Sequence, residues 1–62
     1  MNEAVLRRVV RLIGAGATFA MLAAHARVET VDVMAFVAGE EVDQRVIGRI
    51  DRATAKLAPA ET

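Results

Sequence analysis

The sequence predicts an all-α protein, a compact bundle of four to five short helices. Hydrophobic residues make up 55% of the 62 positions, but most of them are Ala and Val, with only two Phe. Small side chains of this kind let helices approach each other closely. Apolar residues also recur at intervals of three and four, which is the spacing of a helix face, and no segment shows the alternation of a strand. These observations favour helices over a sheet.

The chain is predicted to form one domain over residues 1–58, followed by a frayed tail at 59–62. A chain this short leaves much of its surface in water, so that one core contributes little net stability. The sequence has no cysteine and one histidine, which excludes a disulfide and a Cys/His zinc site. Stability must therefore come from close helix packing and from self-association.

The first helix is expected from Glu3 to Ile13 because its apolar residues share a face. That face consists of Val5, Val9, Leu12 and Ile13, with Leu6 and Val10 on its flank. The other side carries a cationic stripe formed by Arg7, Arg8 and Arg11. Gly14 and Gly16 are expected to end the helix, since glycine adopts left-handed backbone angles at low cost.

Two short helices should follow. Thr18 can cap a helix from Phe19 to about His25, whose apolar face consists of Phe19, Leu22, Ala23 and Ala26. Arg27 then occupies a tight turn, and the backbone there is strained if its φ angle is positive. Glu29 or Thr30 can cap a helix over residues 30–38 that ends at Gly39. The inward residues of that helix should be Val33 and either Phe36 or Val37.

The last helix is expected from Gln44 to about Ala58, after a solvated link at Glu40 and Glu41. Asp43 is a suitable N-cap, and Pro59 stops the helix. The inward stripe should keep the spacing i, i+4, i+7 and i+11, which selects Val46, Ile50, Ala53 and Leu57. Exposed arginines of this segment can pair locally, Arg52 with Asp51 and Arg45 with Glu41 or Asp43.

A secretory signal and a membrane span are the alternatives for the N-terminal part. The arginines at 7–11, the apolar run 12–26 and the segment Ala24-His25-Ala26 have the order of a signal peptide with its cleavage site. Cleavage there would leave 36 residues without cysteine, too few to bury a core of their own. The apolar run holds 15 residues, whereas a bilayer needs about 20. The helical bundle is therefore the favoured interpretation.

Residues 22–39 carry the more specific pattern L-A-x-x-A-x-V-x-x-x-x-V-x-x-F-x-x-G, formed by Leu22, Ala23, Ala26, Val28, Val33, Phe36 and Gly39. This pattern resembles that of lambda-repressor-like (Cro-type) helix-turn-helix domains, and the likeness covers roughly residues 18–57. Ala26 must be small where the two motif helices meet, while Val28, Val33 and Phe36 fill the angle between them. The bundle is thus expected to contain a helix-turn-helix.

The resemblance implies a transcriptional regulator that binds double-stranded DNA, acts as a homodimer or with a protein partner, and works in the cytoplasm. The second motif helix would enter the major groove, and the residues facing bases would be Glu29, Thr30, Asp32 and Ala35. Phosphates would be contacted by Arg27, Arg45 and the stripe of Arg7, Arg8 and Arg11, and Arg49 could line the same rim. Members of the family usually have Ser, Gln, Asn or Arg at the base-facing positions, whereas two of the four are acidic in this chain.

That acidity keeps a second function open, a degenerate helix-turn-helix that docks another protein, for example part of the transcription machinery. A core of this size leaves some apolar residues uncovered, and an exposed patch is expected among Val10, Met21, Val31, Met34 and Val37. Enzymatic activity, a cofactor, a metal, a small-molecule substrate and a membrane are not expected. No nucleophile has a base at a recognisable spacing, His25 should be partly buried at a helix end, and a small bundle lacks room for a substrate cleft.

Overall fold

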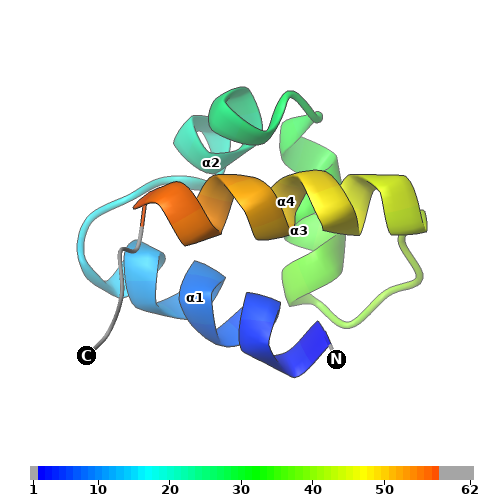
Figure 1. The fold of residues 1–62 in the computed structure, drawn as a ribbon, viewed down its shortest axis with the longest axis horizontal. Helices are drawn as coiled ribbons and strands as arrows, with labels where there is room; N and C mark the ends of the chain where they lie inside the picture. Colours follow the sequence, from blue (N-terminus) through cyan, green and yellow to red (C-terminus); the bar gives the residue numbers. More distant parts are fainter. Residues whose placement is uncertain (1, 58–62) are drawn as a thin grey trace.

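Four helices make up the fold in the computed structural model, which describes residues 2–57. In chain order they are α1 (Asn2–Gly14), α2 (Phe19–Ala26), α3 (Thr30–Val37) and α4 (Gln44–Leu57) (Figure 1). The described residues contain no strand, which confirms the all-α fold class. None of their helices combines the length and apolarity needed to cross a membrane. The tail expected at 59–62, including Pro59, lies outside the described residues.

Helices α3 and α4 each pack against the other three helices, and α4 makes the more extensive contacts with α1. Figure 1 shows α1 along one side of α4, α2 along the other, and α3 running behind α4 at a steep angle. Helices α2 and α3 also pack against each other. The apolar run 12–26 is therefore divided between the end of α1, a turn and α2.

The first interhelical turn is made at Gly16. Gly14 is still helical, whereas Gly16 has a φ of 111°, a value that L side chains rarely adopt. Thr18 then caps α2 as predicted, since its Oγ1 accepts a hydrogen bond from the N–H of Met21 at 3.0 Å. A threonine in this position satisfies one of the amide groups that the start of a helix leaves without a partner.

The turn between α2 and α3 consists of residues 27–29. Arg27 has φ 60° and ψ 44° and is the one non-glycine residue with a positive φ within residues 2–57. A left-handed backbone crowds the Cβ atom of an L residue and costs about 1–2 kcal/mol, so the strain expected for this turn is present. Glu29 is the N-cap of α3, and its N–H donates to the carboxylate of Asp32 at 3.0 Å.

The link between α3 and α4 has Gly39 at its beginning and Asp43 at its end. Ala38 is the C-cap of α3, and Gly39 leaves the helix with a φ of 83°. Asp43 starts α4 as predicted, because its Oδ1 accepts a hydrogen bond from the N–H of Arg45 at 2.8 Å. The observed helix ends lie within one residue of the predicted ones throughout the described chain.

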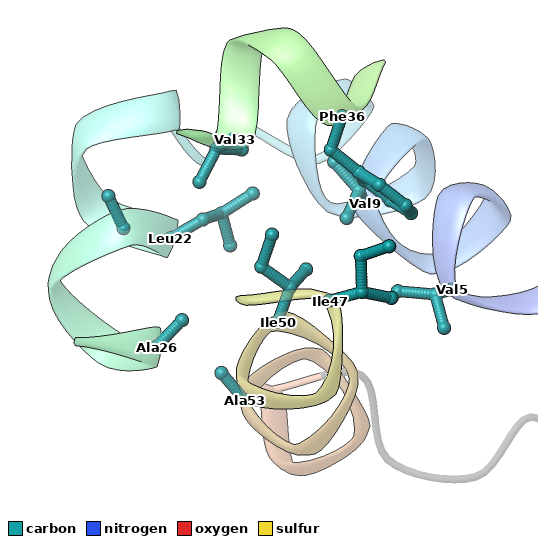
Figure 2. Close-up of a cluster of buried hydrophobic side chains, with 10 residues drawn as sticks. Val5, Val9, Leu22, Ala26, Val33, Phe36, Ile47, Ile50 and Ala53 are labelled. Atoms are coloured by element: carbon teal, nitrogen blue, oxygen red, sulfur yellow. The ribbon is translucent and has the colours of Figure 1, made fainter. Parts of the chain in front are cut away.

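The core lies where the four helices meet, and Figure 2 shows its side chains converging from all of them. The buried apolar residues are Val5, Val9, Leu22, Ala23, Ala26, Val33, Phe36, Ile47, Ile50 and Ala53. Val9 and Val33 are 0% exposed, so α1 and α3 each contribute a fully enclosed side chain. Ala26 is buried as predicted, and Figure 2 shows it beside Ala53 of α4. Its small size therefore serves the contact between α2 and α4.

The buried face of α4 differs from the predicted stripe at both of its ends. Ile47 and Thr54 are buried, whereas Val46 and Leu57 are only partly buried. In Figure 2 the side chain of Ile47 points towards Val5 of α1. Helix α1 covers this side of α4, and the helical spacing of the sequence does not reveal which side that is. Thr54 tolerates burial because its hydroxyl donates to the carbonyl of Ile50 at 2.8 Å.

Arg8 fastens α1 to α4 and is not part of a uniform exposed stripe. Its guanidinium forms an ion pair with the carboxylate of Asp51, and its Nε donates to the hydroxyl of Thr54 at 3.2 Å. The Arg8 side chain is 25% exposed, while Arg7 is exposed on the same helix. The predicted local pair of Arg52 with Asp51 is wrong, because α1 brings Arg8 against this part of α4.

Candidate nucleic-acid interface

An open cleft of about 580 Å³ lies between the end of α2, the following turn and the second half of α4. It is lined by His25, Ala26, Arg27, Arg49, Arg52, Ala53, Lys56 and Leu57. Five of these residues are basic and none is acidic. Because the whole chain has a formal net charge of zero, this cleft is a local concentration of positive charge. We call it the basic cleft.

Helix geometry places the basic residues of α4 on one face. Arg49, Arg52 and Lys56 are spaced by three and four residues, so they are neighbours on the helix surface. Like charges at this spacing repel one another and destabilise a helix slightly. No carboxylate within residues 2–57 forms an ion pair with any of the three. A bound anion would turn this unfavourable arrangement into a favourable one.

The turn adds two further groups to the basic cleft. His25 lies in the last turn of α2, and Arg27 follows it in the left-handed position. The Nη1 of Arg49 donates to the backbone carbonyl of Arg27 at 3.1 Å, which ties the turn to the middle of α4. His25 is exposed, so the expectation of a partly buried histidine is wrong: Ala26, one residue on, occupies the inward position instead.

The predicted phosphate-contacting residues do not gather at one place. Arg27 lines the basic cleft, but Arg7, Arg11 and Arg45 do not. Arg7 and Arg11 lie on α1, Arg45 lies in the first turn of α4 beside Asp43, and all three are exposed. Arg8 is engaged by α4. The sequence prediction therefore found Arg27 and Arg49 of this cleft and missed His25, Arg52 and Lys56.

The outward face of α3 also differs from the expected set. Thr30 is exposed as predicted, and so is Glu29 just before the helix, but Asp32 and Ala35 are partly buried. The carboxylate of Asp32 is occupied by the start of its own helix. The largest exposed apolar side chains of α3 are Val31 at 61% and Met34 at 49%. The solvent face of α3 is thus mainly apolar.

A second hollow of about 370 Å³ lies at the other end of α4. It is lined by Asn2, Glu3, Leu6, Phe36, Gly39, Glu40, Glu41, Val42, Gln44 and Ile47. Three of these residues are acidic and none is basic, and we call this hollow the acidic groove. In the described chain no group of three or more His, Cys, Asp or Glu side chains is arranged to hold a metal ion. The bundle thus has two open hollows, one at each end of α4.

The exposed large apolar residues of the described chain are Val10, Met21, Val31 and Met34. Val37 is partly buried against the core. Val31 and Met34 are neighbours on α3 by their spacing. The predicted exposed patch is therefore present on α3.

Comparison of the chain with models of protein families, with curated proteins and with solved structures gives no match. Function has to be argued from the fold and from the two charged hollows.

Proposed function

We propose that this protein is a small helix-turn-helix domain that binds duplex DNA by holding phosphates in the basic cleft. The observation that carries the proposal is the cleft lining, with five basic residues and no acidic one in a chain of zero net charge. The two short helices α2 and α3 with their three-residue turn have the order that the resembled domains share. A role in transcriptional control follows from the resemblance alone and is part of the proposal.

The form of the cleft favours an extended polyanion over a small anion. A site for a small anion encloses its ligand among a few convergent polar groups, whereas the basic residues here are exposed and spread along α4. Arg49 and Lys56 are about 10 Å apart along the helix axis, at 1.5 Å per residue. Duplex DNA presents one charge per about 1.7 Å of its axis and can engage all of these groups together.

Sequence selectivity should be weak. Bases are distinguished by hydrogen-bond donors and acceptors in the major groove, and the exposed face of α3 offers chiefly the hydroxyl of Thr30 among apolar side chains. Glu29 can accept a hydrogen bond from cytosine N4, but its charge repels the phosphates around it. Binding would therefore depend on phosphate contacts more than on base contacts.

A titration of fluorescent random duplex with two matched double variants tests the proposal. Arg52→Gln/Lys56→Gln and Arg7→Gln/Arg45→Gln each remove two positive charges, but only the first pair lines the basic cleft. Wild type should bind at about 50 mM salt and weaken steeply towards about 200 mM. The first variant should lose much more affinity than the second. Equal losses would assign the binding to overall charge, and no binding of wild type at low salt would reject the proposal.

The apolar face of α3 favours a second function, docking of another protein. Val31 and Met34 are exposed side by side on a helix whose buried residues are Val33 and Phe36. Burial of such a patch is a common driving force for association. The variant Val31→Ser/Met34→Gln separates the two functions. Under the DNA proposal it should bind duplex with nearly unchanged affinity, whereas under the docking function wild type fails to bind duplex and the variant loses its protein partner.

A further inference from the structure

The acidic groove has an apolar floor beneath its glutamates. Phe36 and Ile47 form the buried part of the lining, and Leu6 and Val42 are partly buried beside them. Glu40 and Glu41 are exposed at the rim, and Glu3 faces them from the first turn of α1. A groove of this kind suits a partner that offers cationic side chains with apolar stems or neighbours.

The partner with that chemistry is present in the same chain. The second half of α4 carries Arg52 and Lys56, and Leu57 is partly buried beside them in the basic cleft. The lining of the acidic groove includes Gln44 and Ile47, which lie near the start of the same helix. Gln44 and Lys56 lie about 18 Å apart along the helix axis, at 1.5 Å per residue. The neutral protein therefore has one hollow with an acidic lining and one hollow with a basic lining, at opposite ends of α4.

We propose that the acidic groove of one molecule binds the basic end of α4 of a second copy, so that the protein associates head to tail. The two hollows have linings of opposite charge that share no residue, so one molecule can offer the acidic groove while a second offers the basic cleft. A single contact of this kind leaves one acidic groove and one basic cleft of the pair unoccupied, so a further copy can bind at each. Such contacts build open chains unless the rotation closes them into a ring.

This inference goes beyond DNA binding and does not rest on it, because the acidic groove has no part in holding phosphates. The two are nevertheless linked through the basic cleft. Duplex DNA and the acidic groove of a second copy would compete for Arg52 and Lys56. The pairing charges are exposed, so association should be weak and sensitive to salt, whose screening length falls to about 3 Å at 1 M.

Sedimentation velocity over a range of protein concentrations tests the proposal. Wild type should associate at about 50 mM salt and dissociate at about 500 mM, as screening lengths shorten. Glu40→Gln/Glu41→Gln and Arg52→Gln/Lys56→Gln should each be monomeric where wild type associates. A 1:1 mixture of the two variants should restore association and stop at the dimer, because only one competent pair of ends remains.

Arg7→Gln/Arg45→Gln is the matched control, since it changes the net charge as much as Arg52→Gln/Lys56→Gln but lies outside both hollows. It should associate like wild type. A monomeric wild type at low salt, or association that survives in Glu40→Gln/Glu41→Gln, would overturn the proposal. So would a mixture that stays monomeric. Glu40→Gln/Glu41→Gln should still bind duplex, which separates failure of self-association from failure of the DNA proposal.

Discussion

The guanidinium of Arg49 donates a hydrogen bond to the backbone carbonyl of Arg27 at 3.1 Å. This bond joins the turn between α2 and α3 to the middle of α4, across 22 positions of sequence. It holds the left-handed residue of the turn and places the two arginines in the same cleft. The contact therefore connects the conformation of the turn with the charge of the candidate interface.

Arg49→Gln and Arg52→Gln should separate these two roles. Both remove one charge from the basic cleft, so each should reduce the slope of log affinity against log salt by about 0.9. Only Arg49 bonds to the turn, and its loss should lower the free energy of unfolding by a further ~0.5–1 kcal/mol. Urea denaturation followed by circular dichroism, together with duplex titrations at several salt concentrations, measures both effects. Equal stabilities of the two variants would contradict a positioning role for Arg49.

Arg27→Gly should stabilise the fold and weaken DNA binding. Glycine accepts a φ of 60° without Cβ crowding, and the gain should be about 0.5–1 kcal/mol after the extra chain entropy of glycine is subtracted. The same change removes a charge from the basic cleft. Arg27→Ala is the control, because it loses the charge but keeps the crowded backbone. Thermal unfolding should rank glycine above alanine, while duplex affinity should fall to a similar extent in both.

Arg8 should act in stability and not in DNA binding. Replacing Arg8 with Gln removes the ion pair to Asp51 and the hydrogen bond to Thr54. The pair is partly exposed, so the loss should be about 0.5–1.5 kcal/mol. A double-mutant cycle with Asp51→Asn should give a coupling energy of a few tenths to about 1 kcal/mol. Additive effects of the two substitutions would show that the ion pair contributes nothing to stability. A large loss of duplex affinity would show that Arg8 does contact DNA.

Ala26 should reject a larger side chain. It is 5% exposed and lies beside Ala53 of α4, so Ala26→Leu should push α2 from α4 and cost about 1–3 kcal/mol. Ala24→Leu is the matched control, because Ala24 is exposed on the same helix and leucine forms helix nearly as well as alanine. The unfolding midpoint in urea should fall for the first variant and stay almost unchanged for the second.

The positions of the helices could be read from the sequence because they depend on near neighbours. Thr18 and Asp43 bond to amides two or three residues further on, and Gly39 takes a backbone angle that other residues avoid. The inward residues Leu22, Val33 and Phe36 follow from the three- and four-residue spacing of a helix face. All of these relationships lie within a single helix or turn.

Tertiary structure alone decided which side of α4 is buried and where the charges meet. Helical spacing is compatible with burial of either Val46 or Ile47. Ile47 is the buried residue because α1 packs on its side of α4. Arg52 is the sequence neighbour of Asp51, yet Asp51 pairs with Arg8, which lies 43 positions away in the sequence. The basic cleft likewise joins α2 and its turn to α4, so its charge depends on how helices pack, which local spacing does not encode. Sequence determined the helices of this protein, and the contacts between them determined its surfaces.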